Sequence, residues 1–303
     1  MVKHALAMHF DSQVFRPPQE AYTPLLQVTH GCSYDKCTYC NMYDQNPFGL
    51  SSREEITSDI KELASSAFPY NRIYLVNGDP FCLSADKLTW IMDEIQKYIP
   101  TVKTFSMYAS IRNISTKTDE ELAYLRSRGI DILYMGVESG FTQALTFVNK
   151  GYTAKEALEQ LKRLEKAGIE HSQGVMLGLL GAGRGIETGK ENGKFFSQLN
   201  PKAIWFMSTT VMPKTELERQ RDSGEYIEAS EYERVQEIRA FLESVDMKES
   251  TYFNSIHPTN TFNLEGYLPE DKEKMIKQCD EVINDYTQDT FQKLFNRNKN
   301  SRF

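Results

Sequence analysis

The sequence predicts an α/β fold built around a parallel β-sheet. Short apolar runs alternate with amphipathic helical segments from about residue 24 to residue 208. Motifs typical of helix starts precede the helical segments, and glycines follow several of them. A repeated order of strand and helix implies a parallel sheet with right-handed crossovers. About six such units fit before residue 210, and this pattern alone is compatible with either an open sheet or a full eight-fold barrel.

Six apolar runs have the length of strands, at residues 25–28, 72–76, 104–108, 130–137, 173–177 and 203–207. Between them, apolar residues recur with the helical period. The two clearest buried helix faces are Ile56, Ile60 and Leu63, and Leu88, Ile91 and Ile95. A Ser or Thr followed three residues later by Glu predicts helix starts at residues 52, 118 and 153. Gly129 and Gly168 predict helix ends, each leading into a strand.

The alternation fades after residue 209. Two long helical stretches are predicted over residues 231–245 and 269–295, and an unusual segment rich in Asn and aromatic residues, 252–263, lies between them. This segment could form a lid over a site or a plug at the bottom of a barrel, since loops commonly carry function. We find no low-complexity linker, so the sequence predicts one domain with a C-terminal cap.

The composition is that of an ordinary globular protein, with 40% hydrophobic and 25% charged residues in a chain of 303. No run of 18 apolar residues exists, which argues against a membrane span, and the first eight residues are too short for a signal-peptide core. We therefore expect a cytoplasmic protein. The net charge of −7 and the lack of a long basic block disfavour nucleic acid as a partner and favour a small-molecule substrate.

Three of the five cysteines fall in one nine-residue segment directly after the first predicted strand. Cys32, Cys37 and Cys40 can together hold a soft metal or an iron–sulfur cluster, with one of the usual four positions left open. Cys82 and Cys279 are single and distant, and we expect them to behave as small buried apolar side chains.

Two other interpretations of the cysteines are disfavoured. A structural zinc site needs four ligands, and the chain offers one cysteine arm with His30 as a possible fourth ligand in an awkward position two residues before Cys32. A disulfide framework fits poorly with a long chain, an odd number of cysteines and no secretory signal.

Further candidate residues follow the predicted strands, at the edge of the sheet where ligands gather. The second strand runs into Asn77-Gly78-Asp79-Pro80, where a glycine allows close approach of a ligand and carbonyls can accept hydrogen bonds from an ammonium group. An ordinary strand-terminating turn is the alternative. The fourth strand ends at Glu138, framed by glycines, and a buried carboxylate there needs a ligand or a basic neighbour.

The cysteine loop and the segment 136–140 together resemble the radical S-adenosylmethionine (radical SAM) enzymes. They are most similar to the branch that includes the elongator catalytic subunit, the methylthiotransferases and oxygen-independent coproporphyrinogen oxidase. The usual cysteine spacing of the family is three residues then two, whereas this chain has four then two. The resemblance implies a partial (β/α)6 TIM-like barrel over residues 23–215, an N-terminal extension over 1–22, and a C-terminal helical extension and possible lid over 216–303.

The resemblance also implies site roles. Cys32, Cys37 and Cys40 would hold a [4Fe-4S] cluster whose open iron binds S-adenosylmethionine (SAM). The turn at Asn77, Gly78 and Asp79 would be a divergent form of the Gly-Gly-Glu turn that holds the amino group of the cofactor. The other implied contacts are Ser110 and Arg112 to the cofactor carboxylate and ribose, Glu138 to SAM, and Gly174, Gly178 and Tyr39 to the adenine. A solvent-facing side chain is the alternative for Arg112, and packing on the core is the alternative for Tyr39.

The implied reaction is reductive cleavage of SAM to methionine and a 5′-deoxyadenosyl radical, which abstracts hydrogen from a substrate. An electron donor such as flavodoxin or ferredoxin would be required. Too few cysteines remain for a second four-iron cluster, which disfavours methylthio transfer. We also expect no cobalamin-binding domain before the predicted barrel, which disfavours cobalamin-dependent methylation. His171 is a candidate substrate contact or a satisfied histidine. The alternative function is a non-catalytic haem or iron–sulfur carrier.

Overall fold

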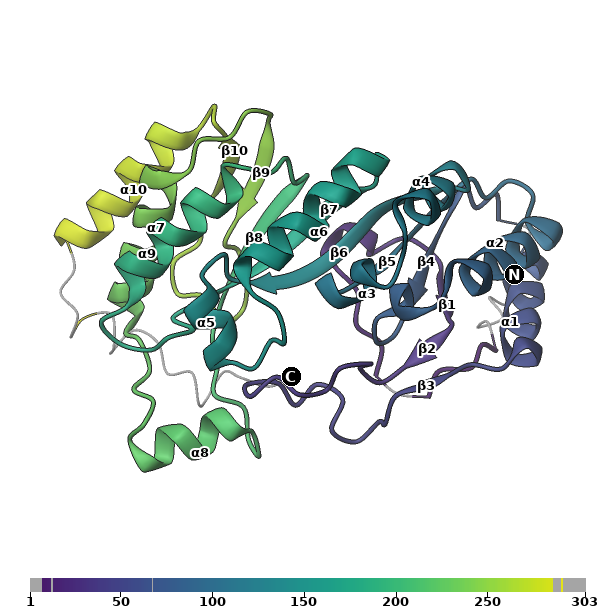
Figure 1. Cartoon of the computed structure of the whole chain (residues 1–303), viewed down its shortest axis with the longest axis horizontal. Helices are drawn as coiled ribbons and strands as arrows, with labels where there is room; N and C mark the ends of the chain where they lie inside the picture. The colour runs from purple at the N-terminus through teal and green to yellow at the C-terminus, as the bar shows by residue number, and fades with distance from the viewer. Residues whose placement is uncertain (1–6, 12, 67, 286–289, 291–303) are drawn as a thin grey trace, which may run out of the picture. The chain divides into compact units, whose positions relative to one another are not determined.

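The computed structural model describes residues 7–11, 13–66, 68–285 and 290. It contains an α/β fold whose main sheet has eight strands in the order β1-β4-β5-β6-β7-β8-β9-β10 (Figure 1). Their bounds are Leu25–Gln27 (β1), Arg72–Val76 (β4), Thr104–Tyr108 (β5), Ile130–Glu138 (β6), Glu170–Leu177 (β7), Ala203–Ser208 (β8), Thr251–Asn254 (β9) and Glu265–Leu268 (β10). The predicted α/β class is confirmed, with a mostly parallel sheet of the partial-barrel kind, and all six predicted strands are present.

The helices follow the strands as predicted. They are Arg53–Ser65 (α1), Ala85–Tyr98 (α2), Ile111–Ser115 (α3), Asp119–Ser127 (α4), Thr142–Phe147 (α5), Ala154–Ala167 (α6), Gly185–Phe196 (α7), Glu216–Ser223 (α8), Glu231–Ser244 (α9) and Lys272–Asp285 (α10). The three expected Ser/Thr–Glu pairs all form reciprocal hydrogen bonds at the starts of α1, α4 and α6. Gly129 and Gly168 adopt φ of +109° and +75°, so the predicted helix ends are confirmed as well.

The described chain forms two compact units, whose boundaries fall on either side of residues 36–41, inside β6 and α6, and at the start of β7. The first comprises residues up to 35, 42–135 and 163–170, and the second comprises 36–41, 136–162 and 171 onward. The sequence-based division into residues 1–22, 23–215 and 216–303 stays a prediction.

In the first unit, β1, β4, β5 and the first part of β6 pair in parallel. Both predicted helix faces are buried: Ile56, Ile60 and Leu63 on α1, and Leu88, Ile91 and Ile95 on α2. A short antiparallel ribbon, Thr29–His30 (β2) with Gly49–Leu50 (β3), flanks the segment that carries the cysteines.

The N-terminal segment of the first unit contributes a buried acidic residue to the sheet. Glu20, at the end of the short helix Pro18–Glu20, accepts hydrogen bonds from Arg72 of β4, Ser106 of β5 and Tyr134 of β6. A charged residue is buried only with such partners, so this network fixes the segment before β1 against the sheet.

In the second unit, β7, β8 and β9 pair in parallel, and β10 is antiparallel to β9. Figure 1 shows α7, α9 and α10 beside these strands. Phe241 of α9 lies with its ring centroid 4.8 Å from that of Phe206 on β8 and 5.7 Å from that of Phe253 on β9. Aromatic contacts of this kind make the core between α9 and the sheet.

The C-terminal region differs from its prediction in one respect. It is not purely helical, because β9 and β10 extend the sheet. The segment 252–263 begins in β9 and continues as the loop that leads to β10. The helix predicted over 231–245 corresponds to α9. The helix predicted over 269–295 begins at Lys272, and apart from residue 290 its part beyond residue 285 lies outside the described residues.

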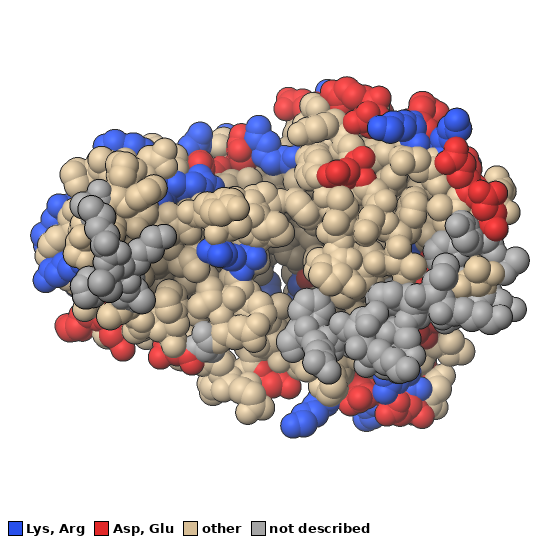
Figure 2. Space-filling view, turned by 180° about the vertical axis from the view of Figure 1, so that it is seen from behind, with Lys and Arg blue, Asp and Glu red and all other residues tan. Residues whose placement is uncertain are grey.

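Among the described residues, no helix combines the length and the apolar character that crossing a membrane requires. Figure 2 shows Lys and Arg side chains interspersed with Asp and Glu side chains over one face of the protein. On that face neither sign forms a continuous surface.

Candidate functional site

The cysteine loop is divided between the two units. Cys32 belongs to the first unit, whereas Cys37 and Cys40 belong to the second. All three are at least partly exposed, and none of the five cysteines forms a disulfide. Within the described residues, no three His, Cys, Asp or Glu side chains are gathered as they would be around a metal ion.

The other two cysteines are poor candidates for ligands. Burial raises the pKa of Cys82 and of Cys279 to about 12. A metal or cluster binds the thiolate, so the thiols of the exposed loop are the ones suited to ligation. His30 is engaged elsewhere, since its Nδ1 lies 2.9 Å from the carbonyl oxygen of Pro47.

The turn after β4 is tied to the cysteine loop within the first unit. The carboxylate of Asp79 accepts hydrogen bonds from the backbone N–H of Ser33 at 3.0 Å and from its hydroxyl at 2.5 Å. Asn113 of α3 donates a third at 3.1 Å. Ser33 is the residue directly after Cys32, so the carboxylate predicted to contact SAM is already occupied by the cysteine loop.

Gly78 is required by the same turn. It adopts φ of +61°, and a Cβ atom there would collide with the carbonyl oxygen of Gly31. The backbone N–H of Gly78 donates to the hydroxyl of Tyr43 at 3.1 Å, and the side chain of Asn77 donates to Gln27 at 2.7 Å. Asn77 is fully buried, and its carbonyl accepts a hydrogen bond from the hydroxyl of Thr29, so the turn is held by contacts within the first unit.

Ser110 and Arg112 lie at the start of α3, after β5. The hydroxyl of Ser110 accepts the backbone N–H of Asn113 and caps the helix. Arg112 is exposed, and its guanidinium stands 4.5 Å from the ring centroid of Tyr34 in the cysteine loop. The structure therefore places both residues at the carboxyl edge of the sheet with local structural contacts, and their cofactor roles stay predictions.

Glu138, in the second unit, has the basic neighbour that its burial requires. Lys150 donates to its Oε1 at 2.8 Å, and both side chains are largely buried. The charge of Glu138 raises the pKa of Lys150 despite burial, which acts in the opposite direction. Sequence reasoning anticipated a basic partner or a ligand but did not identify Lys150.

The backbone around Glu138 is unusual. Its φ is +64°, a left-handed conformation that is costly for a residue other than glycine and that clusters at functional sites. A Cβ atom on Gly136 would meet the Glu138 carboxylate, so the glycine leaves room for that carboxylate to fold back. The backbone of the segment 136–140 is thus shaped to hold the carboxylate of Glu138.

Tyr39 lies within range of the charge of Glu138 and packs on apolar residues of the second unit. Burial and the nearby charge of Glu138 raise its pKa. Its ring contacts two apolar clusters, which contain Leu179 and Leu217 respectively. The flanking backbone is held as well, by a bond of 3.1 Å from the N–H of Thr38 to the carbonyl of Val148. Packing on the core is therefore observed, and contact with adenine stays a prediction.

Gly178 follows β7 with φ of +69°, and α9 occupies the space beside it. A Cβ atom there would stand 3.0 Å from Nε of Arg234 and 3.0 Å from Cβ of Ala229. The backbone N–H of Gly178 donates to Glu237 of α9 at 2.8 Å. Gly174 lies within β7, opposite Trp205 of β8. Sequence reasoning missed Arg234 and Glu237, because helix periodicity marks both only as members of a predicted helix.

His171 lies near the amino end of β7, and its Nδ1 is 2.9 Å from the amide nitrogen of Gln173. It is buried. This placement favours a satisfied histidine over a substrate contact, because ligands gather at the opposite, carboxyl ends of parallel strands.

The donor and acceptor atoms of these residues suit the cofactors that the resemblance implies. Three accessible thiols on one loop leave one coordination position open for a further ligand. The strained and paired carboxylate of Glu138 can accept hydrogen bonds from hydroxyl or ammonium groups. A cluster and SAM therefore fit this set of residues chemically.

Residues 26–185, more than half of the chain, match the model of the family described as the radical SAM superfamily. An uncharacterised protein of Methanocaldococcus jannaschii is 26% identical over 252 residues, which cover 77% of this chain and 73% of that protein. The heme chaperone HemW of Buchnera aphidicola subsp. Schizaphis graminum is 22% identical over 186 residues, which cover 59% of this chain. The match spans 49% of the length of that chaperone.

The fold is also similar to that of a solved enzyme. The crystal structure of methylornithine synthase (PylB) has a TM-score of 0.51, with 16% sequence identity, and covers 90% of this chain and 85% of that chain. At this level of identity the likeness concerns the fold alone.

Proposed function

Because the chain belongs to the radical SAM superfamily, we propose that it is an enzyme that uses a [4Fe-4S] cluster and SAM to abstract hydrogen from a small organic substrate. When bound, these cofactors supply an electron and a 5′-deoxyadenosyl radical. The observation that carries the proposal is the loop with Cys32, Cys37 and Cys40 in a chain whose residues 26–185 match the family.

The chain itself would bind, orient and shield the cofactors, while they carry the difficult chemistry. Cys32, Cys37 and Cys40 would hold the cluster as thiolates. Glu138, which pairs with Lys150, would accept hydrogen bonds from SAM. Main-chain atoms at Asn77 and Gly78 would face the amino group of SAM, because the Asp79 carboxylate is taken by Ser33.

We further propose that the chain belongs with the branch that includes the elongator catalytic subunit and oxygen-independent coproporphyrinogen oxidase. The support is the combination of the cysteine loop with the segment 136–140 around Glu138. The chemistry also needs a reducing partner such as flavodoxin or ferredoxin. A reducing compartment such as the cytoplasm would keep the loop thiols available.

A second candidate function is haem or iron–sulfur carriage without catalysis. The observation that favours it is the 22% identity to a heme chaperone over 59% of this chain. This candidate predicts tight haem binding and negligible SAM cleavage.

Anaerobic reconstitution with iron and sulfide separates the two candidates. The proposed enzyme should bind about four iron atoms per chain and, once reduced, release 5′-deoxyadenosine and methionine from SAM. An intact cluster that yields no 5′-deoxyadenosine would overturn the enzymatic proposal, and stoichiometric haem binding in the same preparation would support carriage.

Cysteine variants test the ligand assignment with matched controls. Cys32→Ala, Cys37→Ala and Cys40→Ala should each lose the cluster and SAM cleavage. Cys82→Ala and Cys279→Ala should keep the iron content, since burial holds both thiols protonated. Loss of iron in either control would contradict the assignment.

A further inference from the structure

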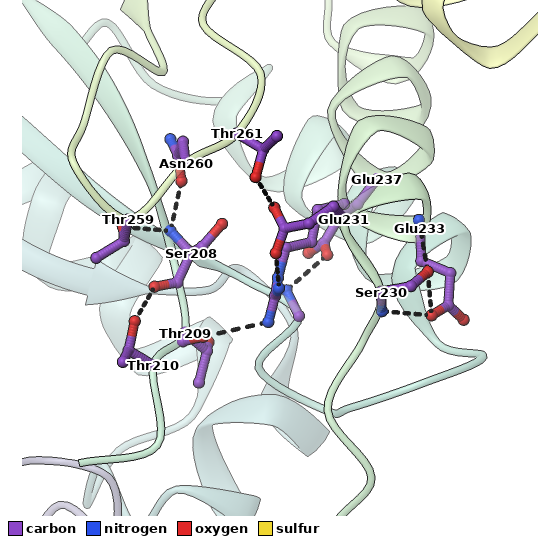
Figure 3. A network of polar contacts seen from close by, with 12 residues as sticks. Ser208, Thr209, Thr210, Ser230, Glu231, Glu233, Glu237, Thr259, Asn260 and Thr261 are labelled. Carbon is purple, nitrogen blue, oxygen red and sulfur yellow. Dashed lines mark hydrogen bonds and ion pairs between the residues drawn. The ribbon is translucent and has the colours of Figure 1, made fainter. Parts of the chain in front are cut away.

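A buried polar network in the second unit connects α9 to the carboxyl end of β8 (Figure 3). Arg234 of α9 donates to the Glu231 carboxylate at 2.6 Å and to the carbonyl of Thr209 at 3.2 Å. Thr261, from the loop between β9 and β10, donates to the same carboxylate at 2.7 Å. The backbone N–H of Ser208 donates to Asn260 of that loop at 2.7 Å. We call these residues, Ser208, Thr209, Glu231, Arg234, Asn260 and Thr261, the Arg234 network.

The network borders a cavity of about 10 Å³ that Ser208, Glu231, Arg234, Asn260 and Thr261 help to line. Two buried polar atoms of the lining residues have no hydrogen-bond partner among the described residues: the hydroxyl oxygen of Ser208 and Nε of Arg234. Both residues are at most 3% exposed. Figure 3 shows the Ser208 hydroxyl pointing toward Glu231 while its backbone N–H faces Asn260. A buried polar group without a partner is costly, so the cavity calls for an occupant.

The chemistry of the lining restricts that occupant. The N–H at Nε of Arg234 can only donate, so the occupant must accept a hydrogen bond. The Glu231 carboxylate can only accept, and the Ser208 hydroxyl can do either. An anion would be repelled by Glu231 and a cation by Arg234. A volume of about 10 Å³ is the lower limit for one water molecule and excludes a larger ligand.

We propose that the cavity binds a single internal water molecule that bridges Arg234 and Ser208. The water accepts from Nε of Arg234 and exchanges a hydrogen bond with the Ser208 hydroxyl. Because Arg234 also holds the carbonyl of Thr209 and stands against Gly178, the water joins α9 to the ends of both β7 and β8. The water thereby helps to hold Gly178 and Thr209 in place at the carboxyl ends of these strands.

A double-mutant cycle with Ser208→Ala and Arg234→Lys tests this bridge in the full-length protein. The two side chains share no direct hydrogen bond, so a coupling between them reports a shared partner. The unfolding equilibrium constant of the double variant should differ from the product of the two single effects by about 2- to 100-fold. Agreement with the product would mean that no water joins them and would overturn the proposal.

A matched cycle replaces Ser208→Ala with Thr210→Ala. Thr210 follows the end of β8 by two residues; its hydroxyl lies 3.5 Å from the carbonyl of Ser208, and it does not line the cavity. This cycle should be additive, and coupling of equal size there would contradict a bridge specific to Ser208. If Arg234→Lys fails to fold, a crystal structure of the unaltered protein decides: density for a water within 3.2 Å of both atoms supports the proposal, and an empty cavity overturns it.

A second inference concerns Asp79 in the first unit and rests on the proposed function for its link to a cluster. Its carboxylate receives three hydrogen bonds, two of them from Ser33, and Gly78 packs directly on Gly31. These contacts flank Cys32 on both sides in the chain.

We infer that Asp79 is a positioning residue that holds Cys32 in its ligating conformation through Ser33. Partners that orient a ligand from outside the coordination shell typically change metal affinity 10- to 100-fold when removed. The role belongs to the carboxylate itself.

Asp79→Ala tests this role first in metal-free protein under anaerobic conditions. The rate at which iodoacetamide alkylates Cys32, read by peptide mass spectrometry, should rise several-fold, with Cys37 and Cys40 unchanged. In reconstituted protein, loss of iron to EDTA should be about 10-fold faster. Asp86→Ala, an exposed acidic residue at the start of α2, is the matched control and should change neither rate.

The two readouts separate the two claims. Unchanged alkylation of Cys32 together with unchanged iron loss in Asp79→Ala overturns the positioning role. Faster alkylation in a protein whose unaltered form binds no iron leaves that role standing and overturns the proposed function instead.

Discussion

Glu20 in the first unit and Glu237 in the second are both buried carboxyl groups, yet their surroundings differ. Glu20 accepts hydrogen bonds from Arg72, Ser106 and Tyr134. Glu237 accepts one hydrogen bond, from Gly178, and its Oε1 has no partner among the described residues. The hydrogen-bond network of Glu20 is complete, whereas that of Glu237 is open, because one of its carboxylate oxygens has no partner among the described residues.

The difference appears in the charge of each group. Burial alone would raise the pKa of Glu20, but hydrogen bonds and the charge of Arg72 outweigh it and lower that pKa. Burial dominates at Glu237 and raises its pKa to about 8. The complete network has a structural role in fixing the N-terminal segment. The open one lies near the charge of Arg234 on the same helix, and one of its carboxylate oxygens has no partner among the described residues.

The largest expected effect comes from breaking the complete network. Arg72→Met would leave Glu20 buried without its cation, and the free energy of unfolding should fall by about 3–5 kcal/mol. Chemical denaturation with linear extrapolation measures this loss. Arg72→Lys keeps the charge and should lose less. A loss below about 1 kcal/mol in Arg72→Met would show that Glu20 does not depend on the pair.

The open network should respond to pH in the opposite sense to the complete one. Glu237 has a folded-state pKa of about 8, above its ordinary value of 4.5, so the folded state binds more protons between these values. Its contribution to stability is therefore fully present below pH 4.5 and is lost as pH rises toward 8, by about 1 kcal/mol per pH unit. Glu20, with a lowered pKa, contributes stability above pH 4.5 that is lost as pH falls below it.

The variant Glu237→Gln isolates the contribution of this carboxyl group to the pH dependence of stability. Denaturation curves at pH 5, 6, 7 and 8 should show a decline in unfolding free energy for the unaltered protein that is absent or much smaller in the variant. The matched control is Glu243→Gln, a carboxyl group on the same helix that pairs with Arg239 near the surface. Equal pH dependence in the unaltered protein and in Glu237→Gln would mean that Glu237 is charged throughout this range.

The framework of the fold could be predicted because its signals are local. Apolar runs, capping pairs and helix-ending glycines identify six strands, with ends within about three residues of those observed, and the helices α1, α2, α4, α6, α9 and α10. The strands β9 and β10 were missed for the opposite reason. Thr251–Asn254 is short and half polar, and its strand conformation depends on pairing with β8, which is distant in sequence.

For the candidate site, the sequence predicts which types of residue are needed better than which residues supply them. The need for a basic neighbour followed from the burial of Glu138, but which residue supplies it depends on how the chain folds, and Lys150 carries no motif. Likewise, nothing in the N-terminal segment indicates that Glu20 is buried, because its partners Arg72 and Tyr134 come from two separate strands. Pairings between distant residues decide the electrostatics of both units.

The smallest effect distinguishes two tyrosines that contact each other on one face of the first unit. Tyr134 donates to Glu20 at 2.9 Å, whereas the buried hydroxyl of Tyr74 has no partner among the described residues. Tyr134→Phe should reduce the free energy of unfolding by about 1–2 kcal/mol, because it removes a hydrogen bond to a charged group. Tyr74→Phe should be neutral within about 0.5 kcal/mol or stabilising, since it removes a buried hydroxyl that makes no bond. Parallel denaturation of the two variants measures both, and an equal loss in each would mean that the Glu20 network does not end at Tyr134 but includes Tyr74 as well.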